Sequence, residues 1–215
     1  MRIIIAGGHG KIARLLSRQL ADAGHEPIAL IRNADHSDDV RAAAAEPLVL
    51  DLEHAAVSYL SSVLMGADAV VFAAGAGPNS GPARKQTVDR DGAILLADAA
   101  VAAGVRRMVV VSSIGADDYD ASSDDAFQVY LRAKSEADAE VRERDLDWTI
   151  VRPGVLTDDA PTGLVRVGAS VQRASIPRAD VAALIASALG NRRAIRAQFE
   201  VVSGNTPIAE ALDSL

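Results

Sequence analysis

The segment Gly7-Gly8-His9-Gly10 follows a short apolar run, residues 2–6, and is the first part of the chain whose spacing suggests a chemical task. Glycine at position 7 permits a tight turn, and glycine at position 10 leaves no side chain where a pyrophosphate would approach the backbone. The small Ala13 lets the following helix pack closely on a sheet, and the free N–H groups at the start of that helix favour phosphate. The pattern Gly-x-x-Gly-x-x-Ala predicts a dinucleotide-binding turn, and the alternative is a strand-to-helix turn without a ligand. The residues expected to contact the cofactor here are Gly7, Gly8, His9, Gly10, Lys11 and Ile12.

The residue after the second expected strand, 27–31, bears on the choice between NADP and NAD. A carboxylate at this position would receive the adenosine ribose hydroxyls of NAD. The chain has Arg32 instead, and a guanidinium makes bidentate, charge-assisted hydrogen bonds to a phosphate. Arg32 therefore favours NADP(H) and makes NAD(H) the less favoured cofactor, unless Arg32 is only a solvated loop charge.

The ends of the third and fourth expected strands offer further cofactor contacts. Asp51 could accept a hydrogen bond from the adenine amino group while Leu52 covers the ring, or Asp51 could be the N-cap of the next helix. The fourth strand leads into small residues that leave room for a cofactor, although close packing alone also selects small residues. These are Ala73, Ala74 and Gly75.

The elements that must position these residues are short Val/Ile-rich runs alternating with Ala/Leu segments of helical period, a pattern typical of β-α units around a parallel sheet. The expected strands are 2–6, 27–31, 47–50, 69–73, 107–112, 148–151, 165–167 and 199–202. The expected helices are 11–23, 38–45, 57–64, 88–103, 124–144 and 178–189. Gly24, Gly104 and Gly190 follow three of these helices, as terminating glycines do. We expect an α/β Rossmann fold, a doubly wound parallel sheet flanked by helices, with residues 1–215 forming one domain.

Three loose segments, 75–81, 115–125 and 155–175, each follow an expected parallel strand. In an open α/β sheet the ligand crevice lies outside the carboxyl ends of the strands. We expect these loops to border the site, and the alternative is that they are plain surface connections.

The bulk composition excludes several classes of function. A formal net charge of -7 argues against nucleic acid or an anionic membrane as partner, because both need a basic surface. The chain has no cysteine and its four histidines are scattered, so no metal site is predicted. The apolar run 2–6 is too short for a signal peptide or a membrane span, and a cytoplasmic location is expected.

Taken in order, these residues resemble the short-chain dehydrogenase/reductase superfamily, in its atypical, NmrA-like branch of NAD(P)H-binding domains, which is related to NAD-dependent epimerases and dehydratases. The resemblance covers nearly the whole chain. The motifs that carry it are Gly7-x-x-Gly10-x-x-Ala13, Arg32, Asp51, Ala73–Gly75, Val88-Asp89-Arg90-Asp91-Gly92, Val109-Val110-Val111-Ser112-Ser113, Tyr130-x-x-x-Lys134, Arg152-Pro153-Gly154 and Arg178-Ala179-Asp180-Val181-Ala182.

The resemblance implies that a serine, a tyrosine and a lysine act together on a carbonyl or an alcohol. Ser113, or otherwise Ser112, would hydrogen-bond the substrate oxygen, and Tyr130 would give or take its proton. Lys134, one helical turn from Tyr130 on the same side of a helix, would hold the nicotinamide ribose and lower the tyrosine pKa into a useful range. A chance match to Tyr-x-x-x-Lys is the alternative. Further cofactor contacts implied by the resemblance are Ser112, Pro153, Gly154 and Val155.

The chain departs from fuller relatives of this family, which carry a long C-terminal substrate lobe. Residues from about 154 to 176 and from 190 to 215 would form a reduced lobe. Its loop 157–163 could line a pocket, close over the nicotinamide or be a surface loop. The reduced lobe weakens any prediction of sugar-nucleotide epimerase activity in particular.

Three functions follow as hypotheses. The leading one is an NADP(H)-dependent oxidoreductase that acts on a small carbonyl, alcohol, quinone or flavin-like substrate. The second is a non-catalytic, NmrA-like redox sensor that reads the NADP(H) balance and passes it to a regulatory protein partner. The third is an epimerase or dehydratase with tightly bound cofactor. The expected oligomeric state is a monomer or weak homodimer.

Overall fold

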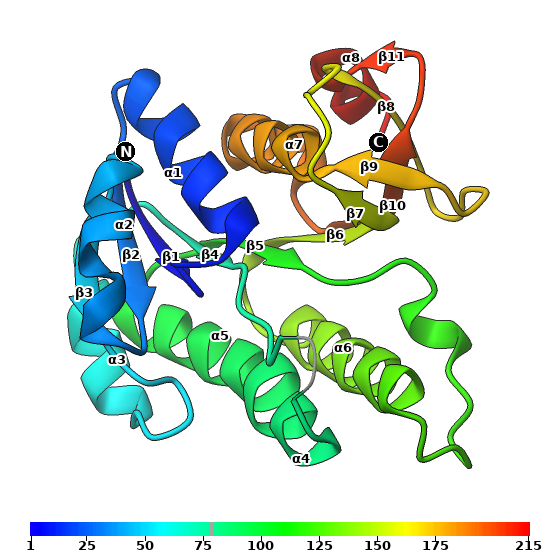
Figure 1. Ribbon diagram of the computed structural model, residues 1–215. Coiled ribbons are helices and arrows are strands. Elements are labelled where there is room, and N and C mark those ends of the chain that lie inside the picture. The colour runs from blue at the N-terminus through cyan, green and yellow to red at the C-terminus, as the bar shows by residue number, and fades with distance from the viewer. Residues whose placement is uncertain (78–79) are drawn as a thin grey trace.

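The computed structural model describes residues 1–77 and 80–215 (Figure 1). The strands are β1 (Arg2–Ala6), β2 (Glu26–Ile31), β3 (Glu46–Val49), β4 (Ala69–Phe72), β5 (Arg107–Val111), β6 (Asp147–Pro153), β7 (Val155–Thr157), β8 (Leu164–Gly168), β9 (Ser175–Pro177), β10 (Ala197–Ser203) and β11 (Thr206–Pro207). The α-helices are α1 (Lys11–Asp22), α2 (Ser37–Ala42), α3 (Val57–Leu64), α4 (Pro82–Arg84), α5 (Asp91–Ala103), α6 (Ala126–Arg142), α7 (Arg178–Gly190) and α8 (Ile208–Asp213). A π-helical segment, Lys85–Arg90, lies between α4 and α5, and short 3-10 turns occur at Ala34–His36, Ala116–Asp118 and Arg192–Ala194.

A nine-stranded sheet in the order β11-β8-β10-β6-β5-β4-β1-β2-β3 forms the centre of the fold. The seven strands from β10 to β3 pair in parallel, and β8 joins β10 in the antiparallel sense. The strand order reverses at β1, which lies between β2 and β4, so the ligand crevice of a Rossmann fold is expected at the carboxyl end of β1. The predicted Rossmann fold is confirmed.

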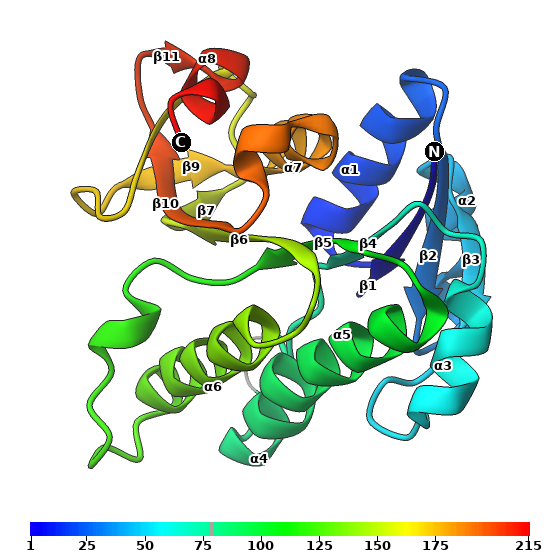
Figure 2. The ribbon, with the colours of Figure 1, turned by 180° about the vertical axis from the view of Figure 1, so that it is seen from behind.

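Both faces of this sheet are covered, as its hydrophobic strands require. In β1, Ile3 and Ile5 belong to the core on one face, and Ile4 and Ala6 belong to the core on the other. Helices α1 and α7 lie on the first face and α3, α5 and α6 on the second (Figures 1 and 2). The alternation of side chains along each strand therefore produces two cores, one on each side of the sheet.

The C-terminal third adds elements at the β6 edge of the sheet. Strands β10, β8 and β11 extend the central sheet, while β7 and β9 form a separate two-stranded parallel sheet. Helix α8 packs near β8 and β11 (Figure 1). Four of these C-terminal elements, β7, β9, β11 and α8, have two to six residues, too few to show a periodicity in the sequence, and so does the short helix α4 earlier in the chain.

Two details differ from the expected elements. The helix expected to begin at 88 is preceded by the π-helical segment, and regular α-helix begins only at Asp91. Gly190 is the last residue of α7, with Asn191 as its C-cap, so the prediction that Gly190 follows and terminates the helix is wrong. Gly24 and Gly104 do have the left-handed conformation that terminates a helix, with φ of 78° and 74°. Pro78 and Asn79, in the middle of the loose segment 75–81, lie outside the described residues.

Across the described ranges 1–77 and 80–215, the structure contains no helix with the length and apolar character needed to cross a membrane. The same part of the chain contains no cluster of three or more His, Asp or Glu residues arranged to hold a metal ion.

Candidate functional site

The glycine turn after β1 is fixed by close packing on both sides. Gly7 has φ of 79°, and a Cβ added there would lie 2.5 Å from the Cα of Ala74. A Cβ on Gly8 would lie 2.4 Å from the Cβ of Ala29 in β2. The pattern Gly-x-x-Gly-x-x-Ala treats position 8 as variable, but contact with β2 restricts it to glycine.

Gly10 is less crowded than Gly7 and Gly8, although a Cβ there would still make one tight contact. A Cβ there would meet only the carbonyl oxygens of Gly7 at 3.1 Å and Ala73 at 3.8 Å. Gly10 is the N-cap of α1 and no side chain caps the helix, so the N–H groups of its first turn are free for a ligand. These groups, with the positive end of the helix dipole, fit a pyrophosphate.

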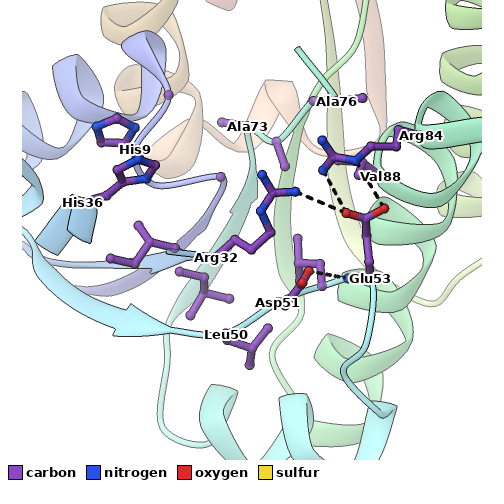
Figure 3. Close-up of a pocket in the computed structure, with 17 residues that line it drawn as sticks. His9, Arg32, His36, Leu50, Asp51, Glu53, Ala73, Ala76, Arg84 and Val88 are labelled. Carbon is purple, nitrogen blue, oxygen red and sulfur yellow. Dashed lines mark hydrogen bonds and ion pairs between the residues drawn. The ribbon is translucent and has the colours of Figure 1, made fainter. Parts of the chain in front are cut away.

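A cavity of about 230 Å³ extends from this turn past the ends of β2, β3 and β4 (Figure 3). Most of the residues predicted to contact the cofactor line this cavity. Its lining comprises Gly7, His9, Gly10, Leu30, Ile31, Arg32, His36, Leu50, Asp51, Leu52, Glu53, Ala73, Ala74, Gly75, Ala76, Arg84 and Val88. We call it the nucleotide cavity.

Arg32 lies at the rim of the nucleotide cavity with its side chain 57% exposed. Its nearest acidic partner is Glu53, at 3.5 Å, but Glu53 is held more closely by Arg84, at 2.8 Å (Figure 3). Thr87 also donates a hydrogen bond to Glu53, at 2.6 Å. The hydrogen bonds from Arg84 and Thr87 keep the pKa of Glu53 below its usual range. Glu53 therefore remains ionised and is engaged mainly by Arg84, which leaves Arg32 loosely held and accessible.

Two histidines stack beside Arg32 at the same end of the nucleotide cavity (Figure 3). The ring centroids of His9 and His36 are 3.7 Å apart and the ring planes differ by 12°. Nε2 of His9 also lies 2.8 Å from a carboxylate oxygen of Asp39. His9 was predicted as a cofactor contact. His36 was not, because the 3-10 turn that brings it across to the glycine turn leaves no periodic signal in the sequence.

Asp51 and Leu52 line the nucleotide cavity where the adenine contact is predicted. The Asp51 carboxylate accepts a hydrogen bond from the backbone N–H of Glu53, at 3.0 Å, and lies 3.1 Å from Nδ1 of His54. The N-cap of α3 is Ala56, so the alternative assignment of Asp51 as helix cap is wrong. The contact with adenine stays a prediction.

A second cavity, of about 600 Å³, shares Ala73, Ala74 and Gly75 with the first. We call it the reaction cavity, because it brings together Ser112, Tyr130 and Lys134. The other residues of its lining are Ile12, Gly77, Ser80, Lys85, Asp89, Val111, Ala126, Phe127 and Leu156.

Lys134 is buried at the wall of the reaction cavity. Its Nζ donates a hydrogen bond to the carbonyl of Val111, at 3.1 Å, and forms an ion pair with Asp89, at 3.3 Å. Burial by itself would lower the pKa of Lys134, but Tyr130 and the carboxylates of Asp89 and Asp138 outweigh burial and raise it. Lys134 is therefore charged at neutral pH.

Asp89 is fully buried and was not predicted as a site residue. It belongs to the π-helical segment, and its carboxylate also accepts a hydrogen bond from the backbone N–H of Ala76, at 3.1 Å. The available signal in the sequence was the motif Val88-Asp89-Arg90-Asp91-Gly92, which places an acidic residue directly after an apolar one, and π-helical turns occur often at functional sites.

Of the two adjacent serines, the structure brings Ser112 to the reaction cavity rather than Ser113. Ser112 is two residues beyond Val110, which belongs to the core facing α6, so the alternation along the strand directs Ser112 to that side. Its hydroxyl donates a hydrogen bond to Asp138 of α6, at 2.7 Å, and Arg152 donates another to the same carboxylate, at 2.9 Å. This geometry favours Ser112, which the sequence offered as the alternative to Ser113, and which serine contacts the substrate stays a prediction.

The segment Pro153–Val155 lines neither of the two cavities in the described part of the chain. A Cβ on Gly154 would lie 2.1 Å from the carbonyl oxygen of Ala174, so this glycine is required for packing against the chain before β9. Val155 is 70% exposed. Leu156 is the residue of this region that reaches the reaction cavity.

Two predicted cofactor contacts at the start of α1 have different surroundings. The side chain of Lys11 forms an ion pair with Asp158, while Ile12 lines the reaction cavity.

Comparison with known proteins agrees with this geometry. A model of the NAD(P)H-binding family matches residues 7–192. The protein YhfK of Bacillus subtilis, named as an uncharacterized sugar epimerase, is 32% identical over 216 residues that cover 100% of each chain. The protein YMR090W of Saccharomyces cerevisiae is 37% identical over 226 residues that cover 100% of this chain and 99% of the relative. Among solved structures, a candidate NAD-dependent epimerase/dehydratase from Bacillus halodurans is 38% identical, covers 100% of both chains and has a TM-score of 0.92. The chain belongs to the NAD(P)H-binding family of Rossmann-fold proteins, as its motifs predicted.

Proposed function

We propose that this protein is an NADP(H)-dependent oxidoreductase that transfers a hydride to or from a small carbonyl or alcohol, a quinone or a flavin-like substrate. The observation that carries the proposal is the reaction cavity itself. Tyr130, Lys134 and Ser112 line one cavity, and that cavity adjoins the nucleotide cavity through Ala73, Ala74 and Gly75.

The side chains of the reaction cavity have complementary roles in the reduction of a carbonyl. A nicotinamide cofactor, when bound, would supply the hydride for the new C–H bond. Tyr130 supplies the proton that the carbonyl oxygen takes up, and in the reverse direction it accepts that proton. Lys134, charged and held by Asp89, provides positive charge beside the phenol. Because the hydroxyl proton of Ser112 is directed to Asp138, the Ser112 oxygen is free to accept a hydrogen bond from the phenol or from a substrate hydroxyl.

The preference for NADP(H) is supported by the end of the nucleotide cavity beside β2. Arg32 is an accessible guanidinium there, and His9 and His36 add two ring systems that can donate hydrogen bonds to a phosphate. The chain has an arginine where an NAD-binding protein carries an acidic residue. We therefore assign this end of the cavity to the 2′-phosphate.

The test is the Tyr130→Phe variant, assayed by NADPH oxidation with a panel of aldehydes, ketones and quinones. Loss of the proton donor should lower kcat for carbonyl reduction by about 10²- to 10⁴-fold while leaving the Kd for NADPH unchanged. Tyr59→Phe, at a tyrosine 57% exposed on α3, is the matched control and should retain wild-type kcat. Undiminished carbonyl reduction by Tyr130→Phe would remove Tyr130 from its proposed role.

A second candidate function is that of an epimerase or dehydratase that keeps its cofactor tightly bound. Its support is the similarity, at 32% and 38% identity, to the two bacterial proteins with epimerase names. Purified protein would then retain nucleotide, detectable by mass spectrometry, and would catalyse reaction without net NADPH consumption. Exchange of free cofactor with each turnover would favour the oxidoreductase.

A further inference from the structure

We propose that the substrate is a flat, conjugated carbonyl compound that carries a carboxylate, and that Lys85 binds that carboxylate. This inference rests on the proposed function and deepens it, because it names the class of substrate that the reaction cavity takes. The observations that support it are the position of Lys85, the charge balance of the cavity and an aromatic wall beside the lysine.

Lys85 is the first residue of the π-helical segment and is half-buried in the lining of the reaction cavity. Its Nζ donates a hydrogen bond to the carbonyl of Gly77, at 2.9 Å, and lies 5.4 Å from the ring centroid of Tyr130. An ammonium has three N–H donors, so one such bond leaves donors for a ligand. Lys85 is thus positioned beside Tyr130, the proposed proton donor, with N–H donors left for a ligand.

The charges in the reaction cavity do not cancel. Its ionised side chains are Lys85, Lys134 and Asp89, and Asp89 is engaged by Lys134, at 3.3 Å. Within the described ranges, no carboxylate lies within ion-pair distance of Lys85. Lys85 therefore gives the cavity a net positive charge in a chain whose overall formal charge is -7, and a cavity of one sign attracts a ligand of the other.

An aromatic wall adjoins this cation. Phe127, in the first turn of α6, lines the reaction cavity and is 50% exposed, although a phenyl ring is among the side chains that gain most from burial. Its ring centroid is 6.0 Å from that of Tyr130, with the planes inclined by 30°. A flat substrate placed against Phe127 would cover this ring, with its anionic group at Lys85 and its carbonyl at Tyr130.

The test measures binding first, so that its result does not depend on turnover. The ligands are 4-carboxybenzyl alcohol and 4-methylbenzyl alcohol, which differ in charge but little in shape, titrated by ligand-observed NMR into protein saturated with NADPH. The wild type should bind the carboxylated ligand about tenfold more tightly, as expected for one charge-assisted contact. Lys85→Gln should abolish the difference, Lys85→Arg should keep it, and Arg192→Gln, at an exposed arginine outside the cavity, is the control that should also keep it.

The kinetic arm uses the matching aldehydes and separates this inference from the function on which it rests. Lys85→Gln should raise KM for 4-carboxybenzaldehyde about tenfold and leave kcat/KM for 4-methylbenzaldehyde within about twofold. Lys85→Glu should reverse the preference in favour of 4-(trimethylammonio)benzaldehyde. Charge-selective binding without turnover of these aldehydes, or of any aldehyde, ketone or quinone in the panel used for Tyr130→Phe, would sustain Lys85 and overturn the proposed oxidoreductase activity. Equal binding of the charged and neutral ligands by wild type and Lys85→Gln would overturn the inference itself.

Discussion

Replacing Asp89 by asparagine tests the central electrostatic feature of the reaction cavity, the buried pair between Asp89 and Lys134. Asparagine keeps the size of the side chain and can still accept the hydrogen bond from the N–H of Ala76, so the change removes little besides the negative charge. Both partners are buried, with side chains 4% and 1% exposed for Lys134 and Asp89. Removing one partner of a buried pair costs about 3–5 kcal/mol. The carbonyl of Val111 still accepts from Lys134, so we expect the lower end, about 3 kcal/mol.

The assay is urea denaturation at pH 7 within a double-mutant cycle of Asp89→Asn and Lys134→Met. The pKa of Lys134 is raised in the folded protein, so the stabilisation by its charge is fully present below the unfolded pKa, about 10.4, and is lost as pH rises through the folded value. The cost of Asp89→Asn should accordingly be complete at pH 7. The double variant should be less destabilised than the sum of the single variants by about 2 kcal/mol. Additivity within about 0.5 kcal/mol would show that the two charges do not interact as the geometry requires.

Three further predictions concern other parts of the site. Arg32→Ala should weaken NADPH binding about tenfold or more, since a hydrogen bond to a charged group contributes about 1.5–3 kcal/mol, and should change NADH binding little. Fluorescence titration with both cofactors measures the two dissociation constants. Equal losses of affinity for NADPH and NADH would show that Arg32 does not bind the 2′-phosphate. Ser112→Ala should lower kcat and cost about 1–3 kcal/mol of stability because it removes one of the donors of the buried Asp138 carboxylate and leaves that carboxylate to Arg152 alone, whereas Ser113→Ala should do neither; steady-state kinetics and urea melts compare the two variants, and the reverse result would restore Ser113. The pKa of Glu53 is lowered in the folded protein, so its ionised carboxylate stabilises the fold above the unfolded pKa of about 4.3, and this stabilisation is lost as pH falls through the folded value. Glu53→Gln should therefore make the free energy of unfolding depend less on pH in acid. An unchanged slope between about pH 5 and pH 3 would contradict this.

The sequence was sufficient where local pattern and chain order determine the structure. The parallel sheet follows from the alternation of Val/Ile runs with helical segments, and the turn at Gly7–Gly10 follows from its place between a strand and a helix. The cavity that contains Tyr130 and Lys134 was predictable because residues four apart on a helix share a face.

The parts that the sequence did not predict depend on contacts between distant segments. The choice between Ser112 and Ser113 depends on which face of the sheet each side chain points to beyond β5, and one residue of register reverses that choice. The partner of Lys134 lies on a different segment of the chain, and His36 reaches His9 through a turn whose bend the composition does not specify. Gly154 has a structural reason that the motif does not reveal, because packing against the carbonyl of Ala174 already requires glycine there, and its contact with the cofactor stays a prediction.

The segment from α4 through the π-helical turn contributes side chains to both cavities. Arg84 reaches Glu53 at the nucleotide cavity, while the adjacent Lys85 lines the reaction cavity. Lys85 and Asp89 both face the reaction cavity although they have opposite roles, since Asp89 is engaged by Lys134 and Lys85 remains available to a ligand. π-Helical turns are rare and occur frequently at functional sites. In the proposed function, this one segment would present Lys85 to the substrate and Asp89 to the buried Lys134, while Arg84 holds the segment to Glu53 at the nucleotide cavity.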